Sequence, residues 1–221
     1  GLSFSFASII EAPVIMMLSA SVALVTDHRS FIRLKRFAYT LNAIITSVML
    51  ICLLPSVFYF VAEDLIGLPE NLAHLTHTTC LLLLPWPCAI GYRRFYQGIL
   101  IRNNLTRRVA YGTVIRLGAM ATTALILAGL KFKGAYIGGA ALSMGVVCEA
   151  IASRIMVHGT LKVLYETPLC VKENVNEVIT YRSIAAFYYP LALTSLLALG
   201  IHPIVTFFIG KSRFAIESFA V

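Results

Sequence analysis

The chain has 221 residues, of which 59% are hydrophobic and only 13% charged, and its mean hydropathy is +0.84. An average soluble domain is roughly 45–50% apolar and about 25% charged, so the composition excludes an ordinary soluble protein and indicates a membrane protein. The formal net charge of +8 does not indicate a nucleic-acid partner, because the basic residues fall mainly in short connections between apolar runs.

Six apolar runs are long enough to cross a bilayer, which takes about 20 helical residues. They span residues 2–25, 37–62, 76–101, 109–130, 138–164 and 183–210. The sequence therefore predicts an all-α fold, a polytopic bundle of six transmembrane helices in the lipid bilayer. In the first connection, residues 30–36 (SFIRLKR) are predicted to form a short interfacial turn or helix, which lays Phe31, Ile32 and Leu34 into the lipid headgroups.

Lysine and arginine are distributed unevenly between the two sets of connections. The connections after the first, third and fifth runs contain ten: Arg29, Arg33, Lys35, Arg36, Arg102, Arg107, Arg108, Lys162, Lys172 and Arg182. The opposite set contains four: Lys131, Lys133, Lys211 and Arg213. By the positive-inside rule the first set is predicted to be cytoplasmic, and we expect a multi-pass protein of the cell membrane, inner or plasma.

Prolines interrupt several of the runs. Pro85 and Pro87 flank a tryptophan in the third run, and Pro190 lies in the last; Pro13, Pro55 and Pro203 are further examples. Proline removes an intrahelical hydrogen bond, so we expect breaks in these helices, and broken helices are typical of secondary transporters. The alternative is that proline is simply more frequent in membrane helices than in soluble ones. A run of small residues near residues 134–145 predicts tight helix packing, at Gly134, Gly138, Ala141 and Gly145.

Residues 85–118 place arginines inside two antiparallel membrane helices. Arg93 and Arg94 precede Arg102 by nine and eight residues, and Arg116 follows Arg108 by eight, so at 1.5 Å per residue all three lie roughly 12–14 Å from the same boundary. Arginine at such depth is costly and indicates a functional site.

Four further polar residues extend this set. Gln97 is one helical turn from Arg93, Arg154 lies eight residues above Lys162, and Glu149 is expected roughly one and a half turns farther out. Glu11 is also intramembrane, in the first run. The interior is then net positive.

A non-functional alternative places Arg93 and Arg94 at the membrane–water interface. If the third helix ends at Tyr92, both side chains can snorkel to the headgroups. Arg116 resists this explanation, because a helix starting at Leu117 has only fourteen residues before Lys131. Glu149 is either a neutral or arginine-paired packing residue or, like Glu11, a residue that couples transport to a proton or another ion.

Arginine suits phosphate and carboxylate groups because its planar fork donates two parallel hydrogen bonds and stays charged. We therefore predict that a small anionic substrate binds near mid-membrane. The candidate substrate-binding residues are Arg93, Arg94, Gln97, Arg116 and Arg154, and the candidate coupling residues are Glu149 and Glu11.

The motifs PWPCAIGYRRFYQGILI, TVIRLG, KGAYIGGAALSMGVVCEA and FYYPLALTSLLALGIHPIVTFFIG resemble the multidrug, oligosaccharidyl-lipid and polysaccharide (MOP) exporter superfamily, and within it the progressive ankylosis (ANK-type) proteins. The resemblance is helix-wide over residues 85–150 and 183–210. It implies a MATE-like architecture, two six-helix bundles around a central cavity, and alternating access. ANK-type proteins are associated with export of pyrophosphate, nucleotides or citrate, and related flippases move lipid-linked diphosphates.

On this resemblance, residues 1–182 match the first lobe and residues 183–221 the first helix of a second lobe. A first helix and nearly all of the second bundle are missing from the match. We expect either a fragment of a longer protein or a cavity assembled from two copies; the partner is then the remainder of the second lobe or a second chain.

The sequence bears on two other classes of function, an enzyme and a scaffold. An intramembrane enzyme is disfavoured, because neither H-E-x-x-H nor G-x-S-x-G occurs. The five cysteines form no C-x-x-C pair and His74 and His77 have no third ligand nearby in the sequence, so we expect no metal and no cofactor. A non-transporting scaffold subunit remains an alternative, as does a flippase for a lipid-linked diphosphate or oligosaccharide precursor.

Overall fold

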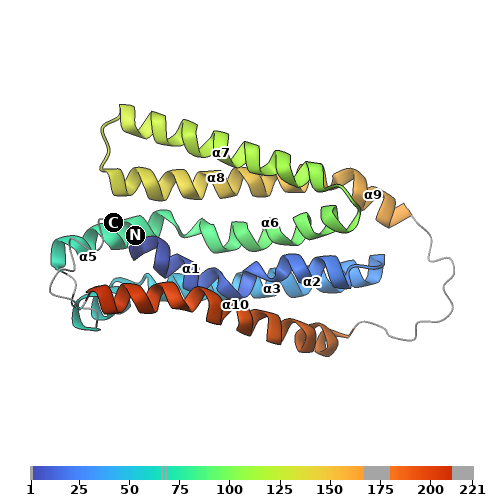
Figure 1. Cartoon of the computed structure of the whole chain (residues 1–221), viewed down its shortest axis with the longest axis horizontal. Coiled ribbons are helices and arrows are strands. Elements are labelled where there is room, and N and C mark those ends of the chain that lie inside the picture. Colours follow the sequence, from blue (N-terminus) through green and yellow to red (C-terminus); the bar gives the residue numbers. More distant parts are fainter. Residues whose placement is uncertain (1, 66, 68, 167–179, 211–221) are drawn as a thin grey trace.

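The computed structural model describes residues 2–65, 67, 69–166 and 180–210, and within these ranges every regular element is a helix (Figure 1). The helices are α1 (Leu2–Ile15), α2 (Met17–Leu24), α3 (His28–Cys52), α4 (Pro55–Tyr59), the π-helical turn η1 (Phe60–Leu65), α5 (Glu70–Leu82), α6 (Pro85–Arg102), α7 (Thr106–Gly129), α8 (Gly134–Met156), α9 (His158–Glu166) and α10 (Tyr181–Gly210). The predicted all-α fold is confirmed. The predicted loop residues Lys172, Lys211 and Arg213 lie outside the described ranges.

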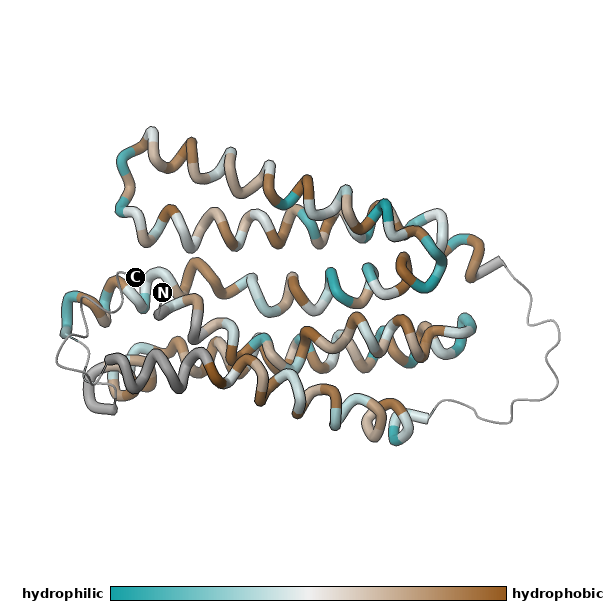
Figure 2. The backbone as a smooth tube through the Cα atoms, viewed as in Figure 1, coloured by the Kyte–Doolittle hydropathy of each residue, from teal (hydrophilic) through white to brown (hydrophobic). Residues whose placement is uncertain are grey.

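Five segments of the described chain are long and apolar enough to cross a membrane: Ala7–Leu24, His28–Cys52, Thr106–Gly129, Gly134–Met156 and Tyr181–Ile201. The sixth predicted span, 76–101, corresponds to α5 and α6, which are separated at Leu83 and Leu84. The segment 76–101 is less apolar than the other predicted spans, because α6 contains a hydrophilic stretch. Figure 2 shows this stretch between more apolar neighbouring helices.

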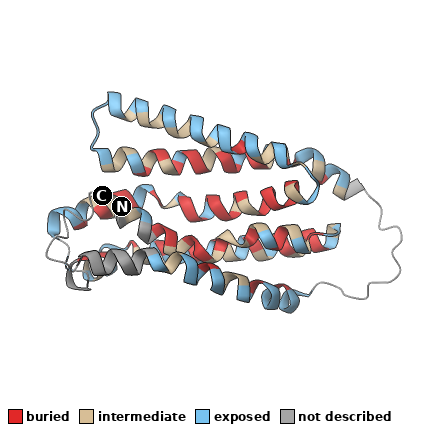
Figure 3. Ribbon diagram, in the orientation of Figure 1, coloured by how far each residue is buried: buried red, intermediate tan, exposed pale blue. Residues whose placement is uncertain are grey.

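Helix α6 occupies the centre of the bundle (Figure 1). It packs against α1, α2 and α3 on one side and against α8 and α7 on the other. Most of its residues are buried, whereas α7, which packs mainly on α8, buries only Gly112 (Figure 3). Because α6 contains Arg93, Arg94 and Gln97, its central place requires polar partners from the surrounding helices.

Glycines allow the close contacts of α6. A Cβ atom on Gly98 would lie 2.7 Å from the backbone oxygen of Leu18 in α2, and a Cβ atom on Gly91 would lie 1.8 Å from Asn42 Oδ1 in α3. No side chain fits at these distances. The glycines therefore set the spacing between α6 and its neighbours, as small residues do in membrane bundles.

The small residues of α8 contribute unevenly to packing. A Cβ atom on Gly145 would lie 2.3 Å from Met120 Cγ of α7, and one on Gly139 would lie 2.9 Å from Thr79 Cγ2 of α5. Gly134 and Gly138 face open space. The predicted ridge is thus wrong for these two glycines, because they are near the helix start, and correct where α8 contacts α7.

The helices are interrupted, as predicted, at or near three of the prolines. Helix α1 contains Pro13 and ends at Ile15, α4 begins at Pro55, and α6 begins at Pro85 with Pro87 in its first turn. The freed backbone has polar partners from other helices. The Tyr188 hydroxyl of α10 donates to the Pro13 carbonyl, and a ring nitrogen of His77 lies 2.9 Å from the Leu53 carbonyl oxygen.

The predicted interruption at Pro190 is wrong, and so is the one at Pro203: α10 runs continuously from Tyr181 to Gly210. A single proline removes one helical hydrogen bond, which a long membrane helix tolerates. The Thr194 hydroxyl donates to the Pro190 carbonyl at 2.5 Å.

The predicted interfacial element at residues 30–36 is also wrong. These residues form the first turns of α3 and continue directly into the span. Phe31 and Leu34 are buried in the core with Phe95 and Ile99 of α6, so they contact protein, not headgroups. Packing of one face of an amphipathic helix stabilises a continuous helix here.

Candidate functional site

Glu149 lies at the centre of a charged cluster formed by α6, α7 and α8. Its carboxylate is fully buried and accepts hydrogen bonds from both Arg93 and Gln97 of α6. Arg93 Nη1 is 2.6 Å from Glu149 Oε2, and Gln97 Nε2 is 2.9 Å from Oε1. Glu149 is therefore paired with an arginine, as one of the two interpretations of the sequence expects.

Arg116 approaches the same carboxylate from α7. Its Nη1 is 4.0 Å from Glu149 Oε2, and its side chain is 28% exposed, against 8% for Arg93. The guanidinium also lies over the Trp86 ring, with its carbon 5.9 Å from the ring centroid. Glu149 can satisfy only part of the charge of two arginines, so Arg116 keeps donors for another anion.

Glycine positions bring α7 close enough for this contact. Gly112, one turn before Arg116, faces Glu149, since a Cβ atom there would lie 3.6 Å from Glu149 Cγ. On α8, Gly145 lies one turn before Glu149, and a Cβ atom there would lie 3.2 Å from the Arg116 carbonyl oxygen. The two helices therefore meet at the level of the charged cluster.

Glu11 of α1 lies on the other side of α6. It is buried, and its carboxylate accepts a hydrogen bond from Nε1 of Trp86. It also interacts electrostatically with Arg93, Arg94 and Arg116. Trp86 thus links the two halves of the cluster, since its indole binds Glu11 and its ring faces Arg116.

Arg94 is the third guanidinium of the cluster. It is half-buried and interacts with Glu149, Glu11, Arg93 and Arg116 through charge alone. Its buried Nε has no hydrogen-bond partner among the described residues. Three guanidinium groups therefore share two carboxylates, and the cluster keeps positive charge and free donors.

Arg154 lies apart from this cluster. Its guanidinium carbon is 5.4 Å from the centroid of the Tyr96 ring, and the Tyr96 hydroxyl is 2.9 Å from that of Tyr39 on α3. Tyr92 stacks on Tyr39 with ring centroids 5.9 Å apart. Four of the five predicted binding residues therefore surround Glu149, while the fifth joins a group of three tyrosines.

The predicted heights of Arg154 and Glu149 are wrong, because α8 ends at Met156 and Lys162 belongs to the separate helix α9. Counted from Met156 at 1.5 Å per residue, Glu149 is roughly 10 Å from the helix end and Arg154 roughly 3 Å. Glu149, rather than Arg154, is thus level with Arg93. The Arg93 side chain does not snorkel to headgroups, because it is buried and binds Glu149.

The sequence interpretation missed Trp86 and Tyr39 as members of these groups. Trp86 is the single tryptophan and lies between two prolines; the available signal is that a buried indole N–H usually has a polar partner. No signal pointed to Tyr39, because its contact with Tyr96 spans two helices far apart in the chain.

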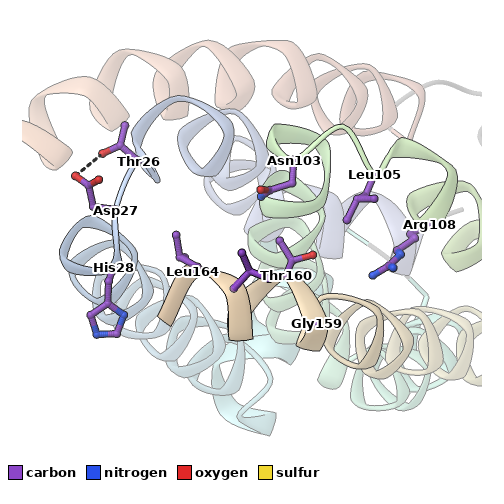
Figure 4. A pocket seen from close by; sticks show the side chains of 10 residues that line it. Thr26, Asp27, His28, Asn103, Leu105, Arg108, Gly159, Thr160 and Leu164 are labelled. Carbon is purple, nitrogen blue, oxygen red and sulfur yellow. Dashed lines mark hydrogen bonds between the residues drawn. The ribbon is translucent and has the colours of Figure 1, made fainter. Parts of the chain in front are cut away.

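Cavities lined by described residues lie outside the charged cluster. One, of about 540 Å³, is formed where the α2–α3 turn, the α6–α7 turn and α9 meet (Figure 4). Asp27 and His28 lie at one end and Arg108 at the other, and the Arg108 guanidinium donates to the Met156 carbonyl at 2.7 Å. The second, of about 510 Å³, is a groove between α3 and α10.

Among the described residues, no group of three or more His, Cys, Asp or Glu side chains could hold a metal ion. The charged cluster offers guanidinium donors, which suit anions, and its two carboxylates already accept hydrogen bonds. Comparisons with family models, with curated proteins and with solved structures return no match to this chain.

Proposed function

We propose that the chain is part of a secondary-active membrane transporter that exports an anionic, phosphate- or carboxylate-bearing substrate by alternating access. One observation carries the proposal: Arg116, in the middle of a candidate membrane span, is 4.0 Å from a carboxylate that Arg93 already binds at 2.6 Å, and its side chain remains 28% exposed. Such a cation in a membrane needs an anion.

The structure of the cluster suggests how an anion binds. Arg116 and Arg94 supply guanidinium donors, while Glu149 of α8 holds Arg93 in place and is itself held by the amide of Gln97. A phosphate or carboxylate fits such planar donors better than a cation does. Drug-like cations are disfavoured for the same reason.

Helix breaks next to the cluster support a moving element. The α5–α6 break lies at Leu83 and Leu84, directly before Trp86, and the α1–α2 break at Met16 follows Glu11 by little more than one turn. Broken helices at a substrate site are typical of secondary transporters. The resemblance to MOP exporters favours the same function, with two lobes around the site.

Uptake into proteoliposomes tests the proposal. We expect flux of at least one of labelled pyrophosphate, citrate or nucleotide through the wild-type protein, and its loss in Arg116→Ala. Arg107→Ala, which removes an exposed arginine at the start of α7, is the matched control and should retain flux. Movement of a lipid-linked diphosphate alone would identify a flippase instead.

A complete absence of anion flux would favour the scaffold alternative. Equal flux in wild type and Arg116→Ala would refute the site. The variant should still fold, because a partly exposed ion pair at 4.0 Å contributes only about 0–1 kcal/mol.

A further inference from the structure

The groove between α3 and α10 is lined by Arg36, Phe37, Tyr39, Thr40 and Tyr181. Its volume of about 510 Å³ is well above that of a single water molecule. Arg36, Tyr39 and Tyr181 are exposed, so the groove opens sideways, toward the surroundings of the bundle.

The charge of the groove is positive. Arg36 has no ion-pair partner within the described ranges, and no carboxylate among the described residues lines the groove. Lys35 adds a second cation, with Nζ 5.5 Å from the centroid of the Tyr39 ring, and exposed Arg182 follows Tyr181. A ligand of this groove is therefore anionic.

The groove lies near the starts of α3 and α10, from which the long side chain of Arg36 can reach toward the headgroups. Tyr181 is the first residue of α10, while Arg36 lies eight residues into α3, roughly 12 Å from its start. Tyrosines gather at the headgroup level, where basic side chains meet lipid phosphates. Below this level, Phe37 and the exposed side chain of Tyr39 offer an apolar wall for an acyl chain.

We propose that this groove binds an anionic phospholipid, with its phosphate at Arg36 and an acyl chain between α3 and α10. The occupant follows from charge complementarity: a zwitterionic lipid brings no net charge for Arg36 and the neighbouring Lys35. The inference does not depend on transport, since the groove lies outside the charged cluster.

Binding there would also touch the tyrosine group. Tyr39 lines the groove and its hydroxyl is 2.9 Å from that of Tyr96, whose ring faces Arg154 at 5.4 Å. The groove is therefore adjacent to the tyrosine group and distinct from the cluster around Glu149.

Native mass spectrometry of the full chain, titrated with phosphatidylglycerol or phosphatidylcholine, tests the proposal. We expect phosphatidylglycerol adducts to be retained more strongly than phosphatidylcholine adducts. Arg36→Gln should weaken phosphatidylglycerol binding about fivefold, the effect of one basic residue near an anionic surface. Arg107→Gln, with the same charge change outside the groove, should bind as wild type does.

Equal retention of both lipids would overturn the proposal, and so would equal losses of phosphatidylglycerol affinity in Arg36→Gln and Arg107→Gln. Displacement of the lipid by glycerol phosphate at equimolar concentration would also overturn it, because that result indicates a site for soluble phosphate. Tyr181→Ala provides a second test within the groove and should weaken binding of phosphatidylglycerol without altering the helical circular-dichroism signal. Wild-type retention in this variant as well as in Arg36→Gln would equally exclude the groove.

Discussion

The ion pair between Arg93 and Glu149 allows a quantitative test of the structure. Glu149→Gln keeps the size of the side chain and removes its charge, which leaves Arg93, only 8% exposed, without its counter-ion. Two unit charges about 4 Å apart attract by about 4 kcal/mol at an effective dielectric constant of about 20. Removing one partner of a buried pair typically costs about 3–5 kcal/mol. We expect a loss in this range.

The double variant Arg93→Gln/Glu149→Gln separates the pair from its surroundings. With both charges removed, Arg93 no longer leaves an unpaired charge between α6 and α8, so the double variant should be more stable than the sum of the two single losses implies. We expect a coupling energy of about 2 kcal/mol, within the 0.5–3 kcal/mol range of contacting residues.

Reversible unfolding in mixed micelles measures these free energies. Glu70→Gln removes an exposed carboxylate in the first turn of α5 and is the matched control, with an expected loss below about 1 kcal/mol. If Glu149→Gln unfolds like this control, or if the single losses simply add, then Glu149 does not pair with Arg93 and the arrangement of α6 against α8 is wrong.

Two further predictions concern helix packing and use the same unfolding assay. Gly98→Ala places a Cβ atom 2.7 Å from a backbone oxygen of α2, so it should destabilise the fold by about 1–3 kcal/mol. Gly138→Ala, whose Cβ atom meets open space, is the control and should be neutral or slightly stabilising. A larger loss of stability in Gly138→Ala than in Gly98→Ala would contradict the close contact of α6 with α2. Ser195→Ala removes a buried hydroxyl that donates to the Ala12 carbonyl at 2.7 Å, so the free energy of unfolding should fall by about 0.6 kcal/mol and at most by about 1.7 kcal/mol. Ser183→Ala, which removes an exposed hydroxyl of α10, is the control. Equal stability of the two variants would argue against this contact of α10 with α1.

Much of the fold could be predicted from hydropathy, because each apolar run contains a helix in the structure. Boundaries between helices were harder. Residues 30–36 have the charges of an interfacial segment, yet Phe31 and Leu34, three apart, pack on α6 and extend α3. Pro190 carries the same local signal as Pro85, but only Pro85 begins a new helix, since tertiary contacts decide whether a break persists.

The candidate site could be predicted in part from helical rise. Counting residues from the helix ends placed Arg93 and Arg116 at one level, and both approach Glu149. The same count failed for Arg154, because it assumed that α8 continues to Lys162. Contacts across the bundle, such as that of Trp86 with Glu11, depend on how helices are arranged, which periodicity alone does not determine.

The proposed anion site rests on Arg116, and ligand-dependent stabilisation tests it most directly. Bound ligand raises the apparent stability of the folded state, by about 2.7 kcal/mol at a hundredfold excess over Kd. We predict that pyrophosphate, citrate or a nucleotide raises the Tm of the wild-type protein and of Arg107→Ala but leaves that of Arg116→Ala unchanged. Stabilisation of Arg116→Ala to the same extent, or of no variant by any of these anions, would contradict an anion site among the arginines around Glu149.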